Sequence, residues 1–157
     1  MRVVLPPITK GLLISWWLFW LLSLLTPDWV LPWGVALNSE LLSSPSLLRI
    51  LGVAVYSLFH ADFLHLFLNS IVFASLAQIL ETSLTRTLFV RLLVMSSLVP
   101  AILWLLLGLF APGPQVVVGA SGLVYALFGA SLCIYPGLPI NLIFISSLLY
   151  LTIDLNY

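Results

Sequence analysis

Residues 59–80, FHADFLHLFLNSIVFASLAQIL, set the character of the whole chain. The last eighteen residues of this stretch contain no Asp, Glu, Lys or Arg, so they are long and apolar enough to cross a bilayer as a helix. Asp62 directly precedes this run and is well placed to cap its first turn. Besides Asp62, three polar side chains lie in the first half of the stretch: His60, His65 and Asn69. Polar groups are costly inside a membrane, so their presence indicates a functional site.

The rest of the chain is equally apolar. Of its 157 residues, 62% are hydrophobic and only 6% are charged, and the mean hydropathy is +1.24. A soluble domain carries roughly 25% charged residues, so this composition indicates an integral membrane protein. The net charge of zero gives no indication of nucleic-acid binding. The single cysteine, Cys133, excludes an intrachain disulfide and any metal or redox motif that needs two cysteines.

Apolar runs separated by Pro, Gly and charged residues predict an all-α, polytopic transmembrane helix bundle. We expect one transmembrane domain over residues 1–157, with five spans at about 11–26, 63–80, 87–110, 120–135 and 140–154. A long loop, 28–58, joins the first two spans, and a short linker, 81–86, follows the second. Long loops without strong periodicity are often functional.

The basic residues predict the orientation of this bundle. With the N-terminus in the cytoplasm, four of the five lie on the cytoplasmic side: Arg2, Lys10, Arg86 and Arg91. In this orientation the second and fourth spans both enter the membrane from the outer side. His65 and Ser121 then lie about one helical turn below the same surface, so the two motifs that contain them can meet.

The second polar motif is GASG, residues 119–122. Ser121 is expected in the first turn of a helix, where backbone N–H groups lack partners and the helix dipole favours negative charge. Gly119 permits a tight entry to this helix, and Gly122 permits close approach of backbone or substrate. Two further residues follow Ser121 at a spacing of four, Tyr125 and Gly129, while Gly122 begins an adjacent stripe of small residues suited to helix packing.

The two motifs together favour serine chemistry. His65 and Asn69 are four residues apart, so they share a helix face and offer two hydrogen-bond donors to a developing oxyanion. His60 would lie about 140° around a continuous helix from His65, so we expect it in the preceding loop or first turn, orienting its neighbours. Taken singly, each motif is also explained by helix packing or an interhelical hydrogen bond. A metal site is a poorer interpretation, because the histidines lack ligand spacing.

At these residues the chain resembles the rhomboid family of intramembrane serine proteases. Residues 59–69 resemble the family's second-span signature, and residues 119–129 resemble its fourth-span serine motif. Further resemblances are at Glu81 with Arg86, near the end of the second span, and at Arg49 in the long loop.

The resemblance implies a role for each matching residue. Ser121 would be the nucleophile, and His65 and Asn69 would form the oxyanion hole with the Ser121 backbone N–H. The supporting residues would be His60, Gly119, Gly122 and Tyr125, the last packing against the base. No metal or cofactor is implied. The substrate would be a transmembrane segment of another membrane protein, and we expect a location in a bacterial plasma membrane.

One part of the family's machinery is absent from these residues. The family's general base is a histidine on a sixth span, and this chain has no histidine after His65. A serine hydroxyl is a weak nucleophile without a base. Three explanations stay open: a fragment that lacks the sixth span, an inactive relative that binds transmembrane clients, or His60 or His65 as the base. We favour the fragment, and we expect these 157 residues to be inactive by themselves.

Overall fold

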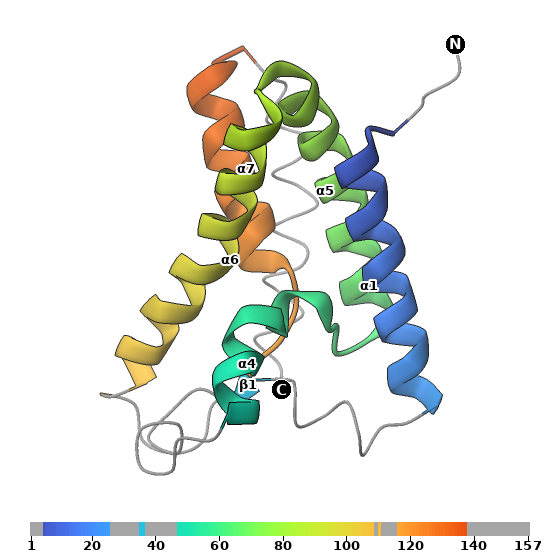
Figure 1. Ribbon diagram of the computed structural model, residues 1–157, viewed down its shortest axis with the longest axis vertical. Coiled ribbons are helices and arrows are strands. Elements are labelled where there is room, and N and C mark those ends of the chain that lie inside the picture. The colour runs from blue at the N-terminus through green and yellow to red at the C-terminus, as the bar shows by residue number, and fades with distance from the viewer. Residues whose placement is uncertain (1–4, 26–34, 37–46, 109, 111–115, 138–157) are drawn as a thin grey trace.

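The computed structural model describes residues 5–25, 35–36, 47–108, 110 and 116–137. Within these ranges the chain forms five α-helices: α1 (Pro7–Leu25), α4 (Leu47–Val55), α5 (Phe63–Ser83), α6 (Arg86–Gly108) and α7 (Ser121–Ile134) (Figure 1). A 3-10 turn, η2 (Tyr56–Leu58), continues α4. The predicted all-α helix bundle is therefore confirmed.

Three of these helices, α1, α5 and α6, are long and apolar enough to cross a membrane. The fourth expected span is the 14-residue helix α7, which is also apolar. The fifth expected span, 140–154, lies outside the described residues. The long loop contributes α4 and η2 at its end, whereas residues 28–34 and 37–46 are not described.

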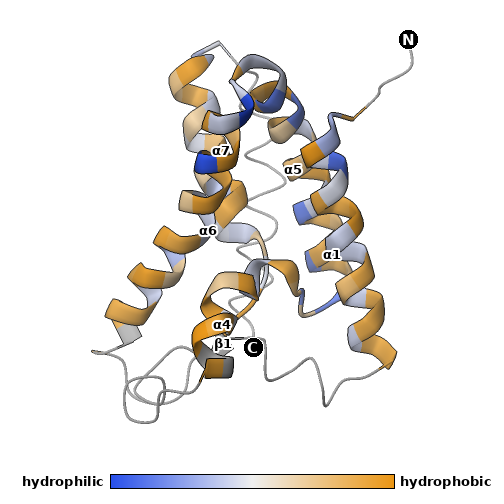
Figure 2. Cartoon of the chain, viewed as in Figure 1, coloured by the Kyte–Doolittle hydropathy of each residue, from blue (hydrophilic) through white to orange (hydrophobic). Residues whose placement is uncertain are grey.

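The helix α5 is the central element of the bundle. It packs against α1 on one side and α7 on the other, and α7 also packs against α6 (Figure 1). Half of the apolar window of α5 is buried, 50%, compared with 11% for α1 and 17% for α6. Hydrophobic residues run along most of the length of these helices (Figure 2). Such extensive apolar exposure on α1 and α6 is suited to lipid, as expected of an integral membrane protein.

The start of α1 is attached to the end of α5 by one carboxylate. Glu81 Oε1 accepts a hydrogen bond from the backbone N–H of Ile8 (2.9 Å). Its Oε2 accepts from the backbone N–H of Thr9 (2.8 Å) and from the Thr9 hydroxyl (2.7 Å). Because the first N–H groups of a helix have no partners within it, this carboxylate caps α1 from another helix. Glu81 therefore belongs to α5, which continues to Ser83, and the linker expected at 81–86 is shorter than predicted.

A short strand pair fixes the entry to α7. Strand β1 (Val35–Ala36) pairs antiparallel with β2 (Val116–Val117), with Val35 opposite Val117. The pair joins the long loop to the segment that precedes the serine motif. The segment that leads into α7 is therefore anchored to the long loop by backbone hydrogen bonds.

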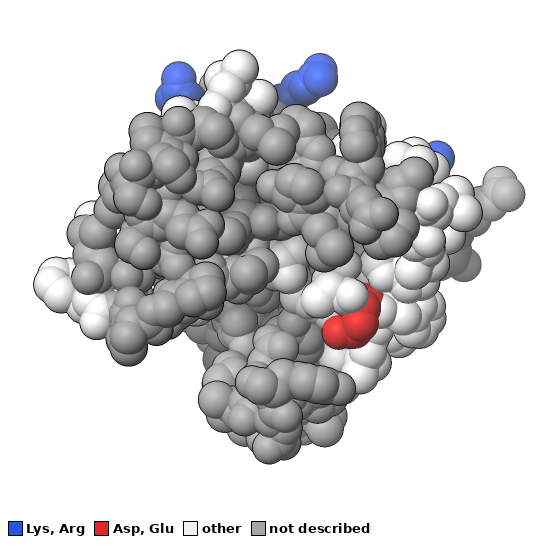
Figure 3. Space-filling view, turned by 90° about the horizontal axis from the view of Figure 1, so that it is seen from below, with Lys and Arg blue, Asp and Glu red and all other residues white. Residues whose placement is uncertain are grey.

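Charged side chains mark the two ends of the bundle. Near the starts of α1 and α6 lie three basic residues, Lys10, Arg86 and Arg91, whereas the exposed Asp62 precedes α5 at the opposite end. Viewed from that opposite end, an acidic group faces the reader and basic groups show only at the margin (Figure 3). This is the separation from which the orientation was predicted. Which end faces the cytoplasm stays a prediction.

Candidate active site

The first polar motif is held by the cap of α5. The Asp62 side chain accepts a hydrogen bond from the backbone N–H of His65 at 2.7 Å, which confirms the predicted cap. The backbone of Asp62 is extended, with φ −147°, so the chain turns sharply into the helix there. This cap places His65 in the first turn of α5, with its side chain buried.

The two motifs meet at Gly119. A Cβ atom built on this glycine would lie 2.5 Å from both Cε1 and Nε2 of His65, far inside van der Waals contact. The Gly119 backbone has φ +105°, a conformation that side chains other than glycine rarely adopt. The imidazole therefore lies directly on the backbone just before Ser121. Two residues span at most about 7 Å, so His65 and Ser121 are neighbours in space.

Ser121 is the first residue of α7 and is half-buried. The preceding cap position, Ala120, has no side chain that could accept a hydrogen bond from the first backbone N–H groups of the helix. These N–H groups carry the positive end of the helix dipole. Within the described part of the chain, the Ser121 hydroxyl makes no hydrogen bond. The arrangement places a hydroxyl beside donors that favour a negative charge.

Asn69 lies one turn beyond His65 on the same face of α5, as predicted, and its side chain is buried. Its Nδ2 donates a hydrogen bond to the His65 backbone carbonyl at 3.0 Å. An amide Nδ2 carries two hydrogens, so this bond fixes the orientation of the amide and leaves a second donor.

His60 lies in the loop before α5, where it was predicted, and it is buried. Its ring is 5.3 Å from the Trp16 ring of α1 and 5.2 Å from the His65 ring, measured between centroids. Burial, together with the nearby His65, lowers the pKa of His60 to about 3, and a hydrogen bond with the Leu58 backbone opposes part of this shift. His60 is thus a neutral ring placed behind His65.

The other predicted supporting residues lie in different surroundings. Gly122 faces α6, because a Cβ there would lie 2.8 Å from Cβ of Pro100. The close neighbour of Gly122 is therefore the Pro100 side chain, not the backbone or substrate that was expected, and this contact packs α7 against α6. Tyr125 is one turn along α7 from Ser121 and is 41% exposed. At Gly129 an added Cβ would meet no described atom within 4 Å, so no close packing is seen there.

Two residues that support the site were missed in the sequence. Tyr56 is almost fully buried: its backbone carbonyl accepts from the Gly119 N–H (3.3 Å), and its hydroxyl donates to the Ser97 carbonyl (2.9 Å). Trp16 is 1% exposed and packs on His60 and Phe73, although it had no distinguishing mark among the aromatic residues of α1. The only signal for Tyr56 in the sequence was its place, as an aromatic residue with a hydroxyl group three residues before the first motif.

The candidate residues offer no metal site. Among the residues that the structure describes, no three His, Cys, Asp or Glu side chains come together in a way that could hold a metal ion.

Comparison with protein families gives a match that covers both motifs. The family model described as Rhomboid domain matches residues 47–155, more than half of the chain, including both polar motifs. No curated protein matches the chain.

Proposed function

Because this chain belongs to the rhomboid family, whose members are generally intramembrane serine proteases, we propose that its full-length form is a serine endopeptidase that cleaves transmembrane segments. The observation that carries the proposal is the contact between His65 and Gly119, two residues before Ser121. It supports a site in which one hydroxyl attacks a carbonyl carbon while several hydrogen-bond donors bind the oxygen of the same carbonyl group. We propose one transmembrane domain over residues 1–157, in a bacterial plasma membrane, with the N-terminus in the cytoplasm.

The proposed reaction follows acyl-enzyme chemistry. The Ser121 Oγ attacks the carbonyl carbon of the scissile peptide bond while a general base takes its proton. As negative charge develops on the carbonyl oxygen, this oxygen accepts hydrogen bonds from the Ser121 backbone N–H, the His65 ring and the second Nδ2 hydrogen of Asn69. The C–N bond then breaks, and the leaving amine takes the proton. Water hydrolyses the resulting ester and restores the hydroxyl.

We propose that the general base is a histidine beyond these 157 residues. His60 is a poor candidate, because a pKa of about 3 leaves its neutral ring too weak a base to take a serine proton efficiently. Using His65 would remove a donor from the oxyanion hole. We therefore propose that His60 supports the His65 ring and that His65 stabilises the oxyanion. Neither histidine is proposed to accept the serine proton.

An inactive rhomboid-like protein that binds transmembrane clients is the second candidate function. It applies if the protein has no base histidine, and no residue from 66 to 157 is a histidine. The coding sequence that follows Tyr157 discriminates between the two. A further apolar span with a histidine near its outer end supports the protease, and a stop codon directly after Tyr157 supports the binding protein.

Activity-based labelling tests the nucleophile. The protein with its downstream sequence is treated with a fluorophosphonate probe in detergent micelles. We expect labelling that is lost in Ser121→Ala and retained in Ser131→Ala, a second serine of the same helix. Parallel cleavage of a transmembrane substrate in vesicles is expected to follow the same pattern. Labelling that persists in Ser121→Ala would remove this residue from the mechanism. A lack of labelling, with crosslinking to transmembrane segments, would favour the binding protein.

A further inference from the structure

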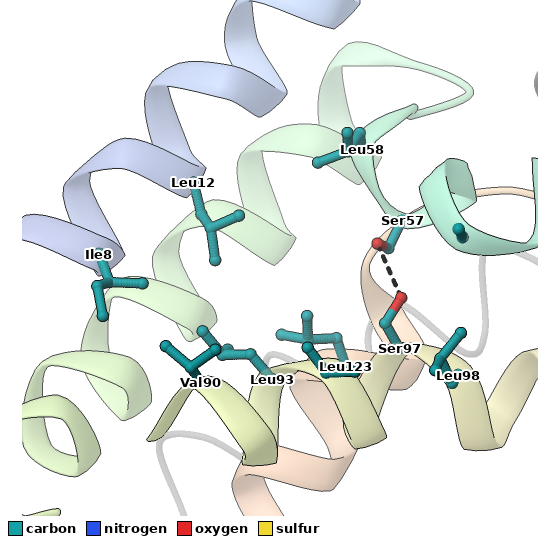
Figure 4. A pocket seen from close by; sticks show the side chains of 11 residues that line it. Ile8, Leu12, Ser57, Leu58, Val90, Leu93, Ser97, Leu98 and Leu123 are labelled. Atoms are coloured by element: carbon teal, nitrogen blue, oxygen red, sulfur yellow. Dashed lines mark hydrogen bonds between the residues drawn. The ribbon is translucent and has the colours of Figure 1, made fainter. Parts of the chain in front are cut away.

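A cavity of about 460 Å³ lies between α1, α4, η2, α6 and α7. In Figure 4, Ile8 and Leu12 approach it from α1, and Val90 and Leu93 approach it from α6. Neither Ser121 nor any other proposed catalytic residue lines it. Its size lies within the range of pockets that bind small ligands.

The lining shows what the cavity can hold. Every lining side chain is apolar except Ser57 and Ser97, whose hydroxyl oxygens lie 3.1 Å apart and hydrogen-bond to each other. A buried water needs two to four polar partners, and the lining offers only these two hydroxyls, which already hydrogen-bond to each other. An empty cavity would deprive its walls of dispersion contacts. Because the protein lies in a bilayer, hydrocarbon is the available filling.

The α6 wall of the cavity is accessible from the side. Val90 is 41% exposed and Val94 is 45% exposed, although both line the cavity. In a bilayer this exposed surface faces lipid chains. The serine pair attaches η2 to α6 at the other end of the cavity (Figure 4). A chain could therefore enter past the valines.

A basic residue lies on the same face of α6 as the cavity. Arg86 is four residues before Val90 and seven before Leu93, so it occupies the same stripe about one turn nearer the start of the helix. Its side chain is exposed. Arg91 lies on the flank of this stripe, about 100° from Val90. An arginine at the end of a membrane helix pairs well with a lipid phosphate, because its planar group donates two parallel hydrogen bonds.

We propose that this cavity binds one acyl chain of an anionic phospholipid whose phosphate pairs with Arg86. The apolar lining selects the chain, and the positive charge of the arginine favours a headgroup whose net charge is negative. Bound in this way, the lipid fills the space between α1 and α6 and stabilises their separation. The proposal depends on the membrane location of the chain, and it stands whether or not the protein is a protease.

Native mass spectrometry of the purified protein in detergent micelles tests the proposal. The probes are palmitoyl-oleoyl phosphatidylglycerol and palmitoyl-oleoyl phosphatidylcholine, which share their acyl chains and differ in headgroup charge. We expect one phosphatidylglycerol to be retained, with phosphatidylcholine bound at least about fivefold more weakly. Val94→Trp, which fills the cavity, should weaken retention about tenfold or more. Met95→Trp is the matched control, because this neighbour is exposed but does not line the cavity.

The headgroup is tested separately. Arg86→Gln should reduce phosphatidylglycerol binding to the level of phosphatidylcholine. Far-UV circular dichroism checks the fold of each variant, and Leu12→Phe fills the cavity from α1 if Val94→Trp does not fold. Equal retention by wild type and a folded cavity-filling variant would overturn the site. Equal binding of both lipids, unchanged by Arg86→Gln, would overturn the anionic headgroup. Dimers that disappear in Val94→Trp would show that a second copy covers this surface instead.

Discussion

Replacing Gly119 by alanine tests the contact on which the proposed site depends. The backbone at this position has φ +105°, and holding a side chain in such a conformation costs about 1–3 kcal/mol. The added Cβ would also lie 2.5 Å from two atoms of the His65 ring, so the ring or the backbone must move. Overpacking of this kind costs about 1–3 kcal/mol more. We therefore expect Gly119→Ala to lower the free energy of unfolding by roughly 2–6 kcal/mol.

The assay is equilibrium unfolding in mixed micelles, followed by tryptophan fluorescence. Gly129→Ala is the matched control on α7, because its added Cβ meets no described atom, and it should be neutral or stabilising by about 0.5–1 kcal/mol. A double-mutant cycle with His65→Ala separates the two causes. Removing the ring should recover the overpacking part of the loss and leave the backbone part. Wild-type stability in Gly119→Ala, or no coupling to His65→Ala, would refute the contact.

Two further predictions concern the residues behind the site. Glu81→Gln should destabilise the protein by about 1–3 kcal/mol, because it removes a charged acceptor from two backbone N–H groups. Thr9→Val, which loses a single hydroxyl bond, should cost less in the same unfolding assay, and the reverse ranking would contradict the cap. His60 binds a proton near pH 6.5 in the unfolded chain but only near pH 3 in the folded protein. Between these two values the unfolded chain binds more protons, so the free energy of unfolding should fall by about 1.4 kcal/mol for each unit by which the pH decreases. His60→Gln should flatten this acid slope in unfolding measured from pH 7.5 to 4.5, and an unchanged slope would assign it to another group.

Hydropathy and local chemistry were sufficient to predict the bundle. Eighteen uncharged residues after Asp62 can satisfy their backbone groups in lipid only as a helix, so α5 was predictable without any tertiary information. The cap by Asp62 was also predictable, since it depends only on residues within one turn. The end of α5 was not, because Glu81 interacts with Ile8 and Thr9, more than seventy residues away.

In the candidate site too, local features were predictable from the sequence and contacts between distant segments were not. The position of Ser121 at a helix start and the shared face of His65 and Asn69 follow from spacing alone. The attachment of Gly119 to Tyr56 could not be read from spacing, because it joins segments sixty-three residues apart. Nor could the contact of Trp16 with His60, since three tryptophans occur close together in α1 and periodicity does not say which one faces the loop.

These contacts make the first helix part of the site. The family match begins at residue 47, yet α1 supplies Trp16, whose ring packs on His60, and His60 in turn packs on His65. The start of the same helix is held by Glu81 at the far end of α5. A shift of α1 along α5 would therefore break the cap at one end and unpack His60 at the other. Because His65 lies directly on the backbone before Ser121, the precision of that hydroxyl depends on a helix that carries none of the reactive groups.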